Sequence, residues 1–185
     1  HHLVTKGMGE GGAEIARLLH DDWMAAVAGS IVIRETFERI SAVLGAAGVP
    51  HAPIKGQDLA YRAYERPETR LMGDIDVIVP EVGFEAARNA LEKQPWIERQ
   101  AWADGEVEGG PWERAFYNVA YRASPVGSPV LLELHWCMGH RHHDRIDWPA
   151  VWARMERKGA GAGSRCLLTA EDALLVAAYH QARGL

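Results

Sequence analysis

The spacing of apolar residues along the chain predicts a mixture of helices and strands. Ile33, Phe37, Ile40 and Leu44 recur at intervals of four, three and four residues, which is the period of one buried helix face, and Gly48 follows as a C-terminal stop. Similar patterns predict helices at residues 12–28, 30–47, 56–64, 81–93 and 148–157, and a last helix from Thr169. Asp172, three residues after Thr169, completes a capping pattern.

Short apolar runs between these helices predict strands. The run 75–80 ends at Pro80, and a second short strand is expected at 96–100. Residues 114–123 and 129–138 form two further runs separated by turn residues, which is typical of a β-hairpin. This order of elements favours an α/β (α+β) fold with one mixed sheet over a regularly alternating, doubly wound sheet.

The same pattern predicts how the chain is organised. We expect an N-terminal helical segment at 1–48, a core at 49–158, and a linker with the start of a C-terminal helical region at 159–185. The glycine-rich stretch 159–163 predicts the linker, and a last strand is expected to follow it. Because no partner helix follows the last one, the chain is expected to be a piece of a longer protein.

Composition and charge limit the possible partners. The chain has 20 basic and 25 acidic residues and a net charge of −5, so a nucleic-acid partner is not expected. Cys137 and Cys166 have no paired spacing, which fits a reducing compartment. The longest apolar stretch, residues 23–33, is shorter than the roughly 20 residues of a membrane span. We therefore predict a cytoplasmic protein with no membrane partner.

Three carboxylates carry the first indication of chemistry. Asp74 and Asp76 flank one residue at the start of the strand 75–80, so they project from the same face. Glu133 lies in the apolar run 129–138, where a charge needs a partner. If these two strands are neighbours, the three carboxylates converge on a site suited to Mg²⁺ or Mn²⁺, as in two-metal phosphoryl transfer.

A turn at Lys55 and Gly56 could hold phosphate groups next to such a metal site. Gly56 lets the backbone approach closely, and the helix that follows presents free N–H groups at its N-terminus. Lys55 adds a point charge, and Arg70 could add a second cation.

Together these stretches resemble a known family. The segments "IKGQDLAYRAYERPETRLMGDIDVIVP", "VLLELHW" and "LTAEDALLVAAYHQAR" resemble the Lys-Gly type of nucleotidyltransferase in the DNA polymerase β-like superfamily, over roughly residues 30–183. Its features are a Lys-Gly turn, an arginine shortly before Asp-x-Asp, a strand with Glu-x-His, and a helix that opens with Glu-Asp. The resemblance implies a palm-like mixed sheet with flanking helices.

The resemblance also implies a reaction. A nucleoside monophosphate, AMP in the commonest case, passes from an NTP such as ATP to a hydroxyl of a small molecule or a protein, and pyrophosphate leaves. Asp74 and Asp76 would ligate Mg²⁺, while Glu133 would hold a second metal and help to deprotonate the acceptor. Gly56, with Lys55 and Gln57, would bind the triphosphate.

Other interpretations of these residues remain open. One alternative is a catalytically silent nucleotide-binding module. Gln57 follows Gly56 where the wider superfamily has glycine or serine, and this difference favours the silent module. Glu133 could instead be an exposed hairpin residue. His135 is interpreted either as a residue that supports the metal ligands from behind or as one that faces a substrate, rather than as a metal ligand itself.

A zinc hydrolase is a further alternative. Its site would use the loop cluster His140, His142 and Asp144, which matches the start of a His-x-His-x-Asp-His motif. Arg145 stands where the last histidine of that motif belongs.

Overall fold

The computed structural model describes residues 10–100, 118–138, 146–158 and 165–183. Its helices are α1 (Glu10–Ala46), α2 (Lys55–Ala63), α3 (Phe84–Glu92), α4 (Trp148–Arg154) and α5 (Ala170–Arg183), with 3-10 turns η1 (Pro67–Thr69) and η2 (Glu81–Gly83). Its strands are β1 (Ala52–Pro53), β2 (Asp74–Ile78), β3 (Ile97–Arg99), β4 (Asn118–Ala123), β5 (Val130–His135), β6 (Glu156–Lys158) and β7 (Arg165–Leu167). Within the described residues, no helix has the length and apolar character that a membrane crossing requires.

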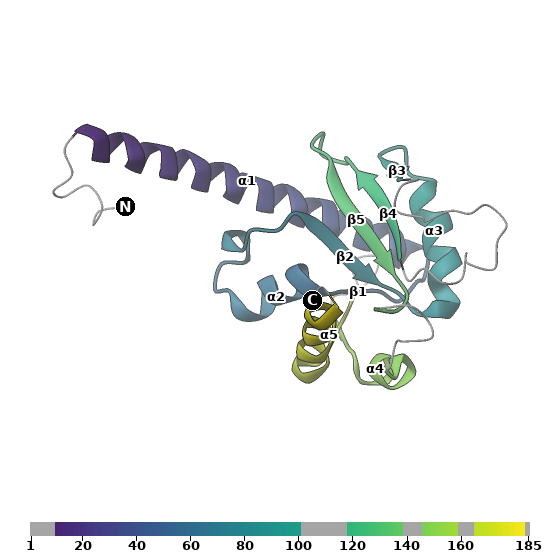
Figure 1. Ribbon diagram of the computed structural model, residues 1–185. Coiled ribbons are helices and arrows are strands. Elements are labelled where there is room, and N and C mark those ends of the chain that lie inside the picture. The colour runs from purple at the N-terminus through teal and green to yellow at the C-terminus, as the bar shows by residue number, and fades with distance from the viewer. Residues whose placement is uncertain (1–9, 101–117, 139–145, 159–164, 184–185) are drawn as a thin grey trace.

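Five strands form one mixed sheet in the order β1-β2-β5-β4-β3 (Figure 1). β2 and β5 are parallel, and the other neighbouring strands in this sheet are antiparallel. The predicted hairpin is confirmed as β4 and β5, although residues 114–117 of its first run lie outside the described residues. The predicted mixed α/β fold is therefore confirmed.

The main apolar core lies between one face of this sheet and the helices α1 and α3. Ile75 and Val77 of β2, together with Leu132 and Leu134 of β5, are completely buried in it. Because side chains alternate between the two faces of a strand, the residues between them point away from this core. The sheet face opposite α1 therefore carries the polar residues of β2 and β5.

The N-terminal helix is longer than predicted. Residues 12–28 and 30–47 belong to one helix of 37 residues, so the predicted break near Gly29 is wrong. A glycine inside a helix costs only about 1 kcal/mol relative to alanine and keeps the backbone hydrogen bonds intact. The hydroxyl of buried Ser30 donates a hydrogen bond to the carbonyl of Arg70, at 3.1 Å, which holds the helix at this point. Gly48, with a φ of 71°, follows the helix as predicted.

Only the C-terminal half of α1 packs into the core. Ile33, Phe37, Ile40 and Leu44 are buried there, as their spacing predicts. The N-terminal half extends away from the sheet (Figure 1).

The segment after α4 differs from the prediction. The helix expected over 148–157 ends at Arg154, and residues 156–158 form β6, which pairs antiparallel with β7. The polar sequence Glu-Arg-Lys has no strand pattern of its own, and its conformation depends on the partner strand. The strand expected after the glycine-rich stretch is confirmed as β7.

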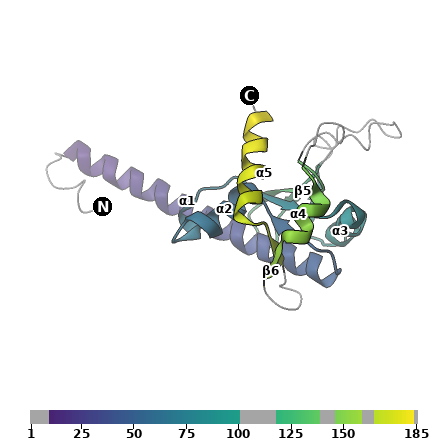
Figure 2. The ribbon, with the colours of Figure 1, turned by 90° about the horizontal axis from the view of Figure 1, so that it is seen from below.

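The start of α5 has the predicted cap. The Thr169 hydroxyl donates to Oδ2 of Asp172 at 2.9 Å and accepts from the Asp172 backbone N–H at 3.1 Å. Arg154 donates two hydrogen bonds to the same carboxylate, at 2.6 and 3.1 Å. This cluster fixes the end of α4 to the start of α5, and Figure 2 shows the two helices from below.

We predict that Thr169→Ala lowers the free energy of unfolding by about 1 kcal/mol, because an N–H group in the first turn of α5 loses its cap. Thr169→Ser keeps the hydroxyl and serves as the control, with a much smaller change. Urea denaturation measures both. Equal losses in the two variants would show that the hydroxyl does not cap the helix.

Candidate functional site

The polar residues of β2 and β5 lie beside one another because the two strands run parallel in a fixed register. Asp76 pairs with Glu133, and Ile78 pairs with His135. The sequence prediction that these strands are neighbours is therefore confirmed. The alternative in which Glu133 is an exposed hairpin residue is wrong, since its side chain is only 25% exposed and faces Asp76 and His135.

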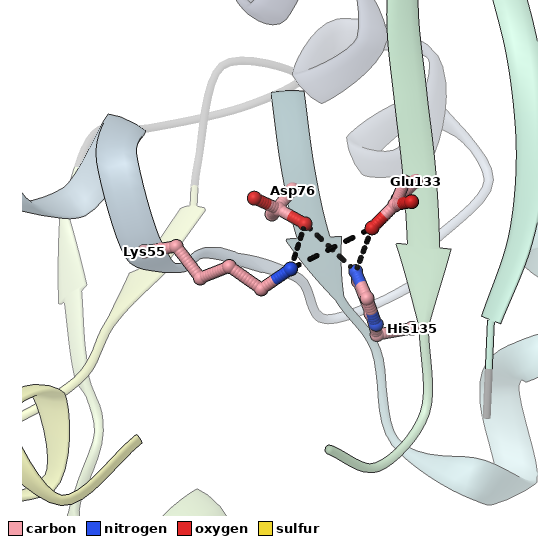
Figure 3. Close-up of polar contacts among 4 residues, drawn as sticks. All are labelled: Lys55, Asp76, Glu133 and His135. Carbon is pink, nitrogen blue, oxygen red and sulfur yellow. Dashed lines mark hydrogen bonds and ion pairs between the residues drawn. The ribbon is translucent and has the colours of Figure 1, made fainter. Parts of the chain in front are cut away.

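His135 lies between the two carboxylates (Figure 3). Its Nε2 is 2.9 Å from Oδ1 of Asp76 and 3.3 Å from Oε2 of Glu133, and the imidazole is completely buried. Within the described part of the chain, these three residues offer metal-ligand atoms that all lie within 4.8 Å of one another.

Lys55 reaches the same two carboxylates from the opposite side (Figure 3). Its Nζ is 2.7 Å from Oδ1 of Asp76 and 3.5 Å from Oε2 of Glu133. The backbone N–H of Ile54 donates to the Asp76 carbonyl at 3.1 Å, so the turn is tied to the strand that carries the aspartate. Lys55 also has a φ of 54°, a left-handed conformation that residues other than glycine rarely adopt.

Burial and charge act against each other in this cluster. Burial alone would raise the pKa of Asp76, but the hydrogen bond and charge of His135 and the charge of Lys55 lower it to about 2. Burial alone would lower the pKa of Lys55, yet the charges of Asp76, Glu133 and Asp74 raise it. Burial would likewise lower the pKa of His135, but its hydrogen bonds to Asp76 and Glu133 raise it. Asp76 therefore stays a carboxylate and Lys55 stays an ammonium.

Asp74 faces an excess of negative charge. Burial raises its pKa first, and the charge of Asp76 and then of Glu133 adds to the shift, while Lys55 lowers it. A single ammonium therefore does not neutralise three carboxylates. A hard divalent cation such as Mg²⁺ or Mn²⁺ fits this set of oxygen donors.

The Lys-Gly turn is supported by Arg70. Its Nε donates to the Gly56 carbonyl at 3.2 Å, and its guanidinium stacks on the Tyr64 ring at 5.7 Å. Ser30 of α1 in turn holds the Arg70 carbonyl. Two of the predicted phosphate-binding residues, Gly56 and Arg70, are thus brought together beside Lys55.

Gln57 has different surroundings. Its side chain is buried and lines a small hollow of about 10 Å³ together with Ser30, Tyr61 and Met72. Its Oε1 accepts no hydrogen bond from the described residues. None of the contacts of Gln57 described by the structure involves the carboxylate cluster.

His180 of α5 is a residue near the cluster that the sequence analysis did not single out. Burial and the charge of Lys55 lower its pKa, and the charges of Asp76 and Glu133 act on it in the opposite direction. The imidazole therefore lies within electrostatic reach of the cluster, on a helix that also contacts α2. The sequence offered one signal for His180: it lies in the segment "LTAEDALLVAAYHQAR", which is part of the family resemblance. The alternative zinc ligands His140, His142 and Asp144 lie outside the described residues.

We predict that Lys55→Met lowers the free energy of unfolding by roughly 3 kcal/mol in EDTA, because it leaves the buried Asp76 and the partly buried Glu133 without the ammonium between them. Urea denaturation measures the loss. Lys93→Met, at an exposed residue at the end of α3, is the control and should change stability by less than about 0.5 kcal/mol. A loss no larger in Lys55→Met than in the control would contradict the ion-pair geometry.

One of three comparisons with known proteins assigns the chain to a family. A search of curated proteins and a search of solved structures found no match to the chain. A family model described as "uncharacterised nucleotidyltransferase" matches residues 1–184, which is nearly the whole chain. On this match, together with the acidic cluster and the Lys-Gly turn beside it, the chain belongs to this nucleotidyltransferase family.

Proposed function

We propose that the protein transfers a nucleoside monophosphate, AMP from ATP in the simplest case, to a hydroxyl of a small molecule or a protein. The observation that carries this proposal is the convergence of Asp76 and Glu133 from parallel strands next to the Lys-Gly turn. Family membership supports the general reaction class. A nucleic-acid acceptor is not proposed, because the protein has a net charge of −5 and nucleic acid is itself negatively charged.

The carboxylates would hold the divalent cation. Asp74, Asp76 and Glu133 are the ligands we propose for Mg²⁺ or Mn²⁺. Asp76 and Glu133 belong to the group of neighbouring metal-ligand atoms, and Asp74 lies two residues before Asp76 on the same face of β2. When bound, such an ion neutralises charge on the phosphates and orients them for in-line displacement.

The turn before α2 would hold the triphosphate. The N-cap residue Ile54 provides no side-chain cap, so the first N–H groups of the helix are available to phosphate oxygens. Arg70 donates a hydrogen bond to the Gly56 carbonyl and adds positive charge beside the turn. His135 would orient Asp76 from inside the sheet rather than contact a substrate freely, since it is completely buried.

The reaction itself needs few groups. The acceptor oxygen forms a bond to the α-phosphorus while the bond from that phosphorus to the bridging oxygen of the β-phosphate breaks, and pyrophosphate leaves with the electron pair. The acceptor proton passes to a carboxylate at the site, for which we propose Glu133, whose side chain is partly exposed.

Incubation with each radiolabelled NTP, Mg²⁺ and a cell extract as the source of acceptor tests this proposal. We predict that Asp74→Asn and Asp76→Asn each reduce label transfer by about a thousandfold, because metal-assisted charge stabilisation contributes several kcal/mol to such reactions. Asp22→Asn, on the exposed N-terminal half of α1, is the matched control and should keep full transfer.

The same assay separates the alternatives. Nucleotide binding without label transfer would indicate the silent binding module. Label transfer that survives both substitutions would contradict the proposed mechanism. Stoichiometric zinc that is lost in His142→Ala would support the hydrolase instead.

A further inference from the structure

Lys55 occupies a place in the acidic cluster that its sequence position did not suggest. The resemblance gave it a contact with phosphate, but its Nζ lies between Oδ1 of Asp76 and Oε2 of Glu133, at 2.7 and 3.5 Å. These two oxygens belong to directly paired residues of parallel strands. Figure 3 shows the ammonium between these two oxygens, the position that a divalent ion held by both carboxylates would otherwise take.

The ammonium is held there by the backbone as well as by charge. The left-handed φ of 54° at Lys55 is strained for a residue with a side chain, and such a conformation persists only where the surroundings enforce it. The hydrogen bond from Ile54 to the Asp76 carbonyl fixes one side of the turn, and the one from Arg70 to the Gly56 carbonyl fixes the other. The Lys55 side chain is only 16% exposed, so it has little freedom to leave.

The two carboxylate oxygens that face Lys55 each already have two polar contacts. Oδ1 of Asp76 contacts both Lys55 Nζ and His135 Nε2, and Oε2 of Glu133 contacts the same two groups. A metal ion bound to these two oxygens would have to displace a buried ammonium. Asp74, which lies two residues before Asp76 on the same face of β2, and the second oxygen of Asp76 remain as ligands.

The charge of the cluster favours one divalent ion over two. Asp74, Asp76 and Glu133 contribute three negative charges. Lys55 compensates one of them, and His135, which contacts both Asp76 and Glu133, compensates a second when its imidazole is protonated, so one or two negative charges remain. One divalent ion is enough to balance this charge before nucleotide binds, whereas two ions would leave at least two uncompensated positive charges in a partly buried site.

We propose that the ammonium of Lys55 takes the place of one of the two metal ions, so that the protein binds a single divalent ion between Asp74 and Asp76. Glu133 then anchors Lys55 instead of ligating a metal, which narrows the ligand set of the proposed function from three carboxylates to Asp74 and Asp76. The other oxygen of Glu133 stays available for the acceptor proton. This inference rests on the proposed function in taking the acidic cluster as a metal site.

Equilibrium dialysis with Mn²⁺ alone tests the inference without any measurement of activity. We expect one Mn²⁺ per wild-type chain and a second in Lys55→Met, with the first bound roughly tenfold more tightly because a neighbouring positive charge is gone. Lys55→Arg keeps the charge and should bind one ion, as should the control Lys93→Met. Thermal unfolding should show that Mn²⁺ stabilises Lys55→Met more than it stabilises the wild type.

Each result has a definite meaning. Two ions in the wild type, or one ion in both the wild type and Lys55→Met, would overturn the role of Lys55 and leave the nucleotidyl transfer proposal intact. The wild-type count decides even if Lys55→Met does not fold. No Mn²⁺ bound to the wild type would overturn this inference and the metal site together, whereas absent label transfer with one bound ion would count against the proposed function only.

Discussion

Two carboxylates side by side on a buried sheet face destabilise the fold by their repulsion, unless positive groups between them offset it. This electrostatic constraint determines how the residues of the site are arranged. Asp76 and Glu133 are paired across β2 and β5, with the Lys55 ammonium on one side and the His135 imidazole on the other. A shift of the register by one residue would turn the aspartate toward the core. The same pairing of β2 with β5 is therefore required by both faces of the sheet: by the apolar face, with residues such as Ile75 and Leu132, and by the charged face.

The position of Lys55 depends on contacts that run back to α1. The hydroxyl of Ser30 holds the Arg70 carbonyl, Arg70 holds the Gly56 carbonyl, and the amide of Ile54 holds Asp76. These hydrogen bonds link the long helix, the Lys-Gly turn and the acidic strand. The buried half of α1 thus supports the site on the far side of the sheet, although none of its residues is in the acidic cluster.

The site combines segments that are distant in the sequence. The turn at 55–56 and the strands β2 and β5 each contribute, and the family match over residues 1–184 covers all of them. If Lys55 is a built-in cation, one side chain performs a task that a second metal ion has in related chemistry. The Lys-Gly dipeptide would then serve two purposes, since the lysine neutralises carboxylates while the glycine leaves backbone N–H groups open to phosphate.

The sequence by itself determined the features that depend on neighbouring residues. The alternation within each strand placed Asp74 with Asp76 on one face of β2 and Glu133 with His135 on one face of β5, and Thr169 with Asp172 marked the start of α5. Only the tertiary structure decided that α1 continues through Gly29, that residues 156–158 form a strand, that Lys55 faces carboxylates, and that His180 lies near them. These outcomes depend on contacts between distant segments, whose packing and charge outweigh the weak local preferences of a glycine, a short polar run or a single cation.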